Sequence, residues 1–538
     1  MRSLVSALAL IAAFGALSGC MRATADHPAA MIYTEGEDID TLNPILTDEV
    51  VVLDLSELTQ GYLVLPDAHG GMTPSLALRV PTQANGLISK DGMTFTYELR
   101  RGVRWTDGTP FTAADILFSV HTILDPAVNV PSRTGYDLIA SIAAPAPDRV
   151  VVRLKQPDAS FSSLFFAPDV GSGILPAHLL RGVAIDRAAY NTLPSGLGPF
   201  QYVRWVRGDR VELRASPTWW GPKPKLQRIT YAIVADQTTD IDQLRTGELD
   251  ADLRPFPIVA AQLQALTGVT TDAPPSDGYE AVNFNWTRPV LQDQRVREAI
   301  AAAIDRGAIV AHVNHGVGTP ACSPMPIVSW AYDAAVHCPP FDPVRAAALL
   351  ESAGWHPDAQ GIRRKNGVPL ALRMVSTAGN LGRDETATII QAALAKIGVA
   401  LSYVRFPASQ LFSHDHGILE DGKFDLALYT EYWGPDPGVG FADFFSCANR
   451  APRGSNFTRY CNPRVDAALA DASAEYDIAR RKADYARAQM LLTHDAPLVV
   501  LYDQPEIVSF TKRLTGIDPD SFTPIPHAWT IAVAGGAR

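Results

Sequence analysis

Apolar residues recur along this chain at two different spacings. The segment RITYAIV, residues 228–234, alternates β-branched and aromatic residues with others and predicts a strand. Val296, Ile300 and Ile304 lie four residues apart, so the segment 293–305 is predicted to be a helix with one buried face. Strand and helix signals of this kind follow one another without a fixed-period repeat, and this alternation predicts an α/β fold.

Residues that favour helix ends and turns divide these segments. Residues 238–240, Thr-Thr-Asp, offer caps for a short helix that ends at Gly247. The pair Asp342-Pro343 favours the start of a helix that Gly354 ends. Asn366-Gly367 then predicts a tight hairpin, because both residues tolerate positive φ angles.

The N-terminal apolar run differs from the rest of the chain. It follows Arg2, extends over residues 4–17 and ends in small residues, which is the pattern of a secretory signal peptide. It is shorter than the roughly 20 apolar residues that cross a bilayer. Residues 17–20, Leu-Ser-Gly-Cys, resemble the bacterial lipobox, so we expect Cys20 to carry a lipid anchor. An ordinary signal peptide with a chance cysteine is the alternative.

The expected mature chain therefore begins at Cys20, and residues 21–30 form a polar, alanine-rich tether. No later stretch approaches 18 consecutive apolar residues. The sequence thus predicts an extracytoplasmic body, in a periplasm or at a cell surface, that lipid holds to the membrane.

The remaining cysteines fit export. There are four of them, and they fall into two locally spaced pairs. We expect the disulfides Cys322–Cys338 and Cys447–Cys461, although four cysteines allow three pairings. Free thiols or a zinc site form the alternative, and a zinc site lacks any CxxC spacing here.

Charge and motifs narrow the function classes. The net charge is −11 and no basic stripe is present, which argues against a nucleic acid as partner. The GxSxG, HExxH and P-loop signatures are absent, so no catalytic residue, cofactor or metal site is predicted. Distant residues can still assemble a catalytic triad.

Two histidine clusters and two acidic pairs are weaker candidates. His414-Asp415-His416, and His312 with His315, could ligate a transition metal. Asp38 with Asp40, and Asp48 with Glu49, could serve as acid/base carboxylates. We interpret all of them as solvated loop or helix-end residues.

Longer blocks resemble the solute-binding proteins of ABC importers, specifically the peptide/oligopeptide/nickel family (family 5). The resemblance begins at YELRRGVRWTDGTPFTAADILFSV (97–120) and recurs in the same order as in that family over almost the whole mature chain. The further blocks are GLGPFQYVRWVRGDRVELRASPTWWGPKPKLQRI (196–229), VNFNWTRPVLQDQRVREAIAAAIDRGAI (282–309), FDPVRAAALLESAGW (341–355), AALAKIGVAL and FDLALYTEYWGPDP.

This resemblance implies a two-lobed periplasmic-binding-protein fold, type II of cluster C, with an extra domain. Two hinge crossings would join the lobes, and we place them near Asn283 and Tyr502. The expected units are a signal peptide (1–20), a tether (21–30), the lobe 1 core (31–58, 186–278 and 504–538), the extra domain (59–185) and lobe 2 (279–503).

The resemblance also implies ligand-binding residues. In peptide binders of the family an aspartate shortly after a tryptophan pairs with the peptide ammonium, and Asp436 follows Trp433 at that spacing. In another alignment Asp436-Pro437 matches a later Asp-Pro, which leaves the ammonium partner absent. Arg383 resembles an arginine that meets carboxylates, and its fork geometry suits this.

The other implied contacts lie near the expected cleft and hinge. Glu49 and Val50 stand where the family offers backbone to an extended peptide. The remaining candidates are Tyr432, Trp433, Asn283 and Trp286.

The function that follows is a lipid-anchored, monomeric binding component, not an enzyme. It would capture short peptides and deliver them to a permease powered by a separate ATPase. A binder of nickel chelates or oligosaccharides is the alternative in the same fold, and a secreted hydrolase is the alternative of another class.

Overall fold

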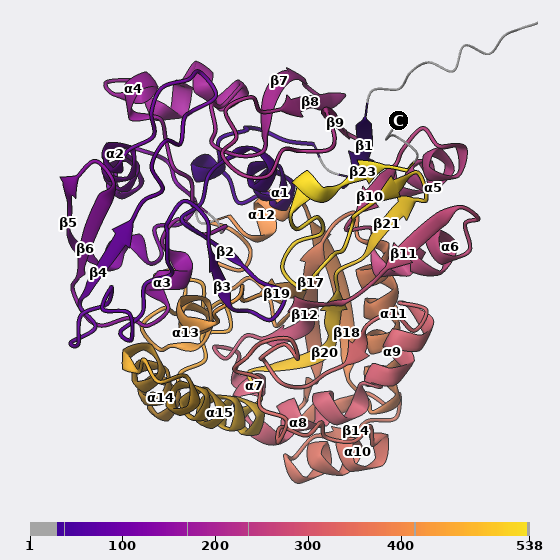
Figure 1. The fold of residues 1–538 in the computed structure, drawn as a ribbon. Helices are drawn as coiled ribbons and strands as arrows, with labels where there is room; N and C mark the ends of the chain where they lie inside the picture. Colours follow the sequence, from indigo (N-terminus) through magenta and orange to yellow (C-terminus); the bar gives the residue numbers. More distant parts are fainter. Residues whose placement is uncertain (1–28, 37, 169–170, 235, 414–415, 535–538) are drawn as a thin grey trace, which may run out of the picture.

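The computed structural model describes residues 29–36, 38–168, 171–234, 236–413 and 416–534. Two large sheets and one three-stranded sheet with its helices carry the fold of this part of the chain (Figure 1). Mixed strand directions and covering helices confirm the predicted α/β class.

The first large sheet has seven strands and draws on three separate parts of the chain. β1 pairs in parallel with β9 on one side and with β10 on the other. α1 (Val50–Thr59) buries Val52 and Leu55 in a core shared with Tyr33 and Tyr231 of the sheet. In spatial order the strands are β11 (Val269–Asp272), β21 (Val508–Thr511), β10 (Ala251–Leu253), β1 (Ala30–Thr34), β9 (Arg228–Ala232), β8 (Arg210–Ala215) and β7 (Phe200–Val206).

The second large sheet has six strands and is covered by helices on both faces. Neighbouring residues of a strand point to opposite faces. Val282 therefore joins a core with α8, α10 and α11, whereas Ala281 joins a core with α13, α14 and α15. The strands in order are β13 (Thr319–Pro320), β20 (Leu498–Pro505), β12 (Pro275–Phe284), β19 (Leu426–Tyr432), β17 (Ala371–Thr377) and β18 (Ala400–Phe406). The helices are α7 (Pro289–Gln292), α8 (Gln294–Ala303), α9 (Arg306–His312), α10 (Pro343–Ser352), α11 (Leu381–Lys396), α12 (Ala408–Leu411), α13 (Gly438–Phe445), α14 (Pro463–Ala474) and α15 (Ile478–Asp495).

The three-stranded sheet of residues 94–154 forms an additional unit beside the first sheet (Figure 1). Its core is rich in aromatic residues and includes the fully buried Trp105. A backbone hydrogen bond from Thr106 N–H to Gly196 O at 3.2 Å ties the unit to the segment that precedes β7 of the first sheet. Its elements are the hairpin β2 (Val64–Pro66) and β3 (Met72–Pro74), the sheet β4 (Thr94–Glu98), β6 (Arg149–Leu154) and β5 (Ile139–Ala146), and the helices α2 (Ala113–Leu124), α3 (Phe161–Leu164) and α4 (Ala177–Leu180).

Two chain segments join the seven-stranded sheet to the six-stranded sheet. Residues 273–274 lead from β11 to β12, and residues 506–507 lead from β20 to β21. The segments lie side by side, because Glu506 N–H donates to Pro274 O at 2.7 Å. The predicted crossings near Asn283 and Tyr502 are misplaced, since both residues are buried in strands of the six-stranded sheet.

Most local sequence signals agree with these elements. Residues 228–232 form β9, and Asn366-Gly367 turns the hairpin of β15 (Arg363–Lys365) and β16 (Val368–Pro369) with φ angles of 51° and 78°. The predicted helix 293–305 ends two residues early, because Asp305 caps a new helix, α9. The helix before Gly247 is α5 (Gln237–Thr246), and its cap is Asp236 rather than residues 238–240.

Short elements complete the described chain. They are α6 (Ala260–Gln264), the strands β14 (His356–Pro357), β22 (Leu514–Thr515) and β23 (Ala532–Val533), and the 3₁₀ turns η1 (Pro44–Leu46), η2 (Tyr136–Leu138), η3 (Ile185–Arg187), η4 (Ala189–Thr192), η5 (Pro257–Val259) and η6 (Ala528–Thr530).

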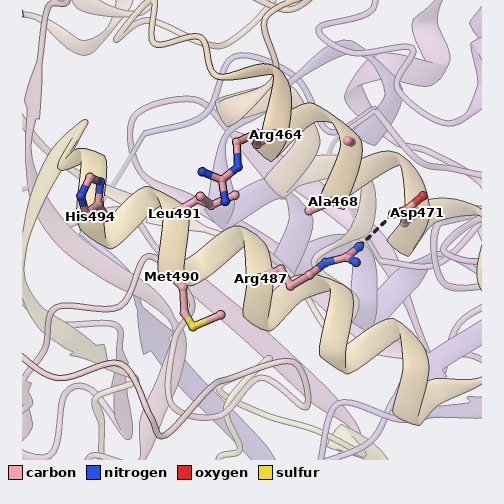
Figure 2. Close-up of a pocket in the computed structure, with 8 residues that line it drawn as sticks. Arg464, Ala468, Asp471, Arg487, Met490, Leu491 and His494 are labelled. Atoms are coloured by element: carbon pink, nitrogen blue, oxygen red, sulfur yellow. Dashed lines mark hydrogen bonds and ion pairs between the residues drawn. The ribbon is translucent and has the colours of Figure 1, made fainter.

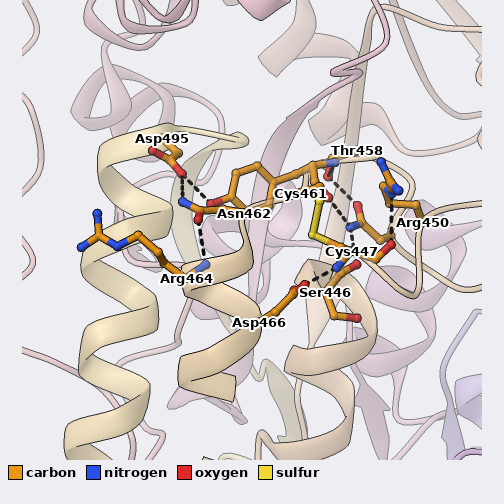
Figure 3. The surroundings of a disulfide bond; sticks show 11 residues. Ser446, Cys447, Arg450, Thr458, Cys461, Asn462, Arg464, Asp466 and Asp495 are labelled. Atoms are coloured by element: carbon orange, nitrogen blue, oxygen red, sulfur yellow. Dashed lines mark hydrogen bonds between the residues drawn. A yellow bond between two sulfur atoms is a disulfide. The ribbon is translucent and has the colours of Figure 1, made fainter. Parts of the chain in front are cut away.

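Both predicted disulfides are present, Cys322–Cys338 and Cys447–Cys461. The second joins the segment after α13 to the start of α14 (Figure 3). Beside it, Cys447 N–H donates to Asp466 Oδ1 at 2.9 Å, and the Asn462 side chain caps α14. The bond therefore fixes two helices that cover the six-stranded sheet.

Replacing Cys447 and Cys461 together by serine is expected to lower the free energy of unfolding by about 3 kcal/mol. The disulfide closes a loop with a sequence separation of 14. Without it the unfolded chain has more conformational entropy, which stabilises the unfolded state by about 3 kcal/mol for a loop of this length. Urea denaturation checks it, with the Cys322/Cys338 double variant as the matched case. An unchanged midpoint and slope would contradict a stabilising role.

Candidate ligand site at the junction of the two sheets

A buried arginine marks the place where the two crossings meet. Arg254 directly follows β10 and adopts a φ angle of 63°. Its Nε lies 2.8 Å from Asp54 Oδ2 of α1, and its Nη1 lies 2.5 Å from Glu506 Oε2 in the second crossing. Only 5% of the Asp54 side chain and 3% of the Glu506 side chain are exposed. Arg254 thus connects α1 of the first sheet to a hinge segment.

Carboxylates outnumber this arginine. Burial raises the pKa of Glu506 to about 8. The positive charge of Arg254 lowers this pKa, whereas the negative charges of Asp54, Asp277 and Asp520 raise it further. Burial and the Asp54 charge likewise raise the pKa of Glu57 to about 8. Within the described residues, Glu506 Oε1 is buried without a hydrogen-bond partner. The junction is therefore an acidic environment suited to a positively charged group.

Tyr432 is close enough to this acidic group and to a second charged network to be affected by the charges of both. It ends β19, and 46% of its surface is exposed. Burial of its hydroxyl raises the pKa of Tyr432, and the charges of Arg254 and Arg383 both act against that rise. The predicted ligand residue Tyr432 therefore lies within the field of both arginines.

Arg383 of α11 is the centre of the second network. Its Nε and Nη2 lie 2.8 and 3.2 Å from the two oxygens of Glu280 in β12. Nη1 donates to Thr377 Oγ1 at 2.7 Å, and Nη2 donates to Thr430 Oγ1 at 2.9 Å. Arg383 thus lies close to the junction, but most of its donors already bind the six-stranded sheet.

Asp436 has an arginine partner of its own. Its Oδ2 and Oδ1 accept from Arg481 Nη1 and Nη2 at 2.5 and 2.7 Å, and less than a tenth of either side chain is exposed. An ammonium could reach this carboxylate only by displacing the guanidinium from a bidentate pair. Asp436 is therefore already paired within the protein, and we expect a ligand ammonium to meet another carboxylate.

Three other predicted residues lie away from the junction. Trp433 is 5% exposed, packs in the core under α13, and donates from Nε1 to Pro324 O at 2.9 Å. Asn283 is 1% exposed inside β12. Trp286 follows that strand, stacks under Arg297 at 4.0 Å and lines a surface pocket of about 510 Å³ with Arg450. Trp433 is therefore part of the hydrophobic core, whereas Trp286 lies at the surface of the six-stranded unit.

Glu49 and Val50 begin α1, the helix that also carries Asp54 and Glu57. Glu49 is the N-cap residue, and Val50 is 41% exposed. The predicted backbone contact thus lies on the same helix as two carboxylates of the junction. Sequence reasoning missed Arg254, Glu57 and Glu506, because Arg254 is 200 positions from Asp54 and 252 positions from Glu506 in the chain.

A larger surface pocket lies elsewhere. It measures about 690 Å³, lies between α14 and α15 (Figure 2) and shares no residue with the junction. Its lining residues include Arg487, whose Nη2 pairs with Asp471 Oδ2 at 2.8 Å. Nothing in its position relates it to the two crossings.

Cys20 and the pair His414-Asp415 lie outside the described residues. In the part of the chain that the structure describes, no three His, Cys, Asp or Glu side chains are grouped as metal ligands. No helix of the same part is both long and apolar enough to cross a membrane.

Comparison with known proteins identifies the family. A family model described as bacterial extracellular solute-binding proteins, family 5 Middle, matches residues 72–452. The chain belongs to this family. Family 5 proteins are substrate-binding proteins of ABC importers rather than enzymes, so the secreted hydrolase is excluded.

Individual proteins agree with this assignment over nearly their whole length. The glutathione-binding protein GsiB of Escherichia coli (strain K12) is 28% identical over 523 residues, which are 95% of this chain and 96% of GsiB. NikZ from Campylobacter jejuni in complex with Ni(L-His) is 25% identical, with a TM-score of 0.80 over 94% of this chain and 99% of NikZ. AppA from Bacillus subtilis in complex with a nonapeptide shares the fold at 21% identity, with a TM-score of 0.82 over 94% and 99% of the two chains. The predicted two-lobed binding-protein fold is confirmed.

Proposed function

We propose that this family 5 protein captures short peptides at the junction of its two sheets and delivers them to a membrane permease. The observation that carries the proposal is the charge arrangement there. Carboxylates around Arg254 offer an acidic environment, and Arg383, whose charge acts on Tyr432 together with that of Arg254, supplies a second, cationic group nearby. A short peptide carries an ammonium at one end and a carboxylate at the other. Its ammonium can meet the carboxylates around Arg254, and its carboxylate can meet Arg383.

Glu506 is the proposed partner of the ammonium. It is 3% exposed, keeps one buried oxygen without a partner among the described residues, and belongs to a crossing. A cation that binds there would give Glu506 Oε1 the partner that it lacks. Because Glu506 belongs to a hinge segment, we propose that this interaction favours the closed arrangement of the lobes over an open one. GsiB and AppA support the peptide class, because their names specify glutathione and a nonapeptide.

A metal chelate is the second candidate, and the similarity to NikZ with Ni(L-His) favours it. Calorimetry with three probes separates the candidates: trialanine, glutathione and the nickel–histidine complex. We expect trialanine or glutathione to bind and the nickel complex to bind at least tenfold more weakly. Tight binding of the nickel complex alone would replace the peptide proposal. Native mass spectrometry of the purified protein provides an independent reading of retained cargo.

Replacing Cys20 by serine is expected to release the protein from the membrane fraction. The lipobox-like residues 17–20 motivate this expectation, since the thiol is the acylation site and an acyl chain contributes about 0.8 kcal/mol for each buried CH₂. Fractionation of cells that express each form, followed by mass spectrometry of the N-terminus, measures the change. A serine variant that stays with the membrane and remains acylated would disprove the anchor.

A further inference from the structure

The two lobes also touch outside the two crossings. There the additional unit, which is attached to the first sheet, meets helices of the six-stranded sheet, and Figure 1 shows α3 beside α13. Ala159 N–H, just before α3, donates to Ser473 O of α14 at 2.8 Å. Tyr476, between α14 and α15, donates its hydroxyl to Gly92 O at 2.9 Å, and its ring packs against the core of the additional unit.

This contact is close enough to depend on glycine. A Cβ on Gly438, the first residue of α13, would lie 2.3 Å from Cβ and 2.6 Å from Oγ of Ser160. Real atoms do not approach so closely, so the contact forms only because Gly438 has no side chain. The two surfaces are therefore packed against each other here.

Charged groups from both lobes meet beneath these contacts. Asp158 of the additional unit is 4% exposed and accepts from Ser160 N–H at 2.9 Å. Burial raises the pKa of Asp158, while the charge of Arg481 on α15 lowers it and that of Asp436 raises it. The positive charge of Arg481 thus partly compensates the negative charges of two carboxylates. Asp436 belongs to the same lobe as Arg481, and Asp158 approaches it from the other lobe when the protein closes.

We propose that Tyr476, Gly438 and the Asp158–Arg481–Asp436 group form a latch that sets how much of the protein is closed. The latch shares no residue with the group of Arg254, Asp54 and Glu506, so we expect it to act on closure rather than on ligand contacts. Apparent affinity scales with the fraction of protein in the closed form. Weakening the latch therefore lowers the affinity for every ligand by the same factor. This inference rests on the proposed function only in assuming that a ligand binds between the lobes.

The test uses Tyr476→Ala and Gly438→Ala, with Ile478→Ala as the matched control. Ile478 lies two residues after Tyr476 and is 60% exposed, outside the contact. Fluorescence energy transfer between dyes on the additional unit and on α10 measures closure of the full-length protein without any ligand. We expect both latch variants to shift the population toward the open form, Ile478→Ala to leave it unchanged, and Tyr476→Phe to have an intermediate effect.

Binding of trialanine and glutathione completes the test. We expect Tyr476→Ala to weaken both by the same factor, about tenfold, as for the loss of a hydrogen bond together with an apolar contact. Energy transfer like that of the wild type in both latch variants would overturn the latch, and so would a loss confined to one probe. A shifted population in a protein that binds neither probe would support the latch and reject the peptide ligand. Urea denaturation of Tyr476→Phe, which keeps the ring, verifies that the lobes stay folded.

Discussion

Glutamine in place of Glu506 is expected to weaken the binding of peptides with a free amino terminus about 30-fold or more. The substitution keeps the size of the side chain but removes the charge that faces the ammonium. Loss of one partner of a buried charge pair costs about 2–5 kcal/mol, and about 1.4 kcal/mol corresponds to a factor of ten. Arg254 keeps its bonds to Asp54, so the first sheet retains its connection to α1.

N-acetylated peptides are the control for this effect. They lack the ammonium, so they should bind the wild type weakly and lose little more in Glu506→Gln. Asp436→Asn provides the contrast, because this carboxylate pairs with Arg481 in the latch. Asp436→Asn should weaken the binding of free and of acetylated peptides by the same factor. If Asp436→Asn instead removes the preference for free amino termini and Glu506→Gln does not, the ammonium partner is Asp436.

The pH dependence gives the same carboxylate a second signature. Burial raises the pKa of Glu506 to about 8, so much of this group carries a proton at pH 6 to 7 in the ligand-free protein. An ammonium favours the ionised form, so binding releases a proton and affinity increases as pH rises. Calorimetry between about pH 5.5 and 7, below the titration of a peptide amino group near 7.7, should show this slope in the wild type and a flatter one in Glu506→Gln.

Local chemistry made much of the fold predictable. Asn366-Gly367, Asp342-Pro343 and the alternating residues 228–232 specify their turn, helix start and strand from a few neighbouring residues. The two disulfides followed from local spacing in an exported chain. The crossings were harder to place, because a strand that enters a hinge has the same apolar pattern as the rest of the strand.

The candidate site could not be read in the same way. Asp436 stands at the spacing that the family resemblance gives to an ammonium partner, yet Arg481, 45 residues later, binds both of its oxygens. Glu506 and Arg254 carry no motif and meet only after β10 and β20 have taken their places in different sheets. Contacts between residues that are distant in the chain determine which carboxylate is paired within the protein. The spacing of residues along the chain does not predict such contacts.

Replacing Arg383 by methionine is expected to lower the free energy of unfolding by about 3–5 kcal/mol. The substitution leaves Glu280, whose side chain is 3% exposed, without its guanidinium partner in the middle of the six-stranded sheet. An uncompensated buried charge is costly, whereas removal of both charges is close to neutral. The double variant Arg383→Met with Glu280→Gln should therefore recover most of the loss in urea denaturation. Equal losses in the single and double variants would contradict this account.

The folded double variant also tests whether Arg383 meets a ligand carboxylate, as the family resemblance implies. Glu280, Thr377 and Thr430 accept from Nε, from both donors of Nη2 and from one donor of Nη1, which leaves one Nη1 donor without a partner among the described residues. One remaining donor supports only a modest preference for a carboxylate. We therefore expect the ratio of affinities for trialanine and its C-terminal amide to change less than threefold in the double variant. A tenfold or larger change, about 1.4 kcal/mol, would establish Arg383 as the carboxylate partner and Glu280 as the group that positions it.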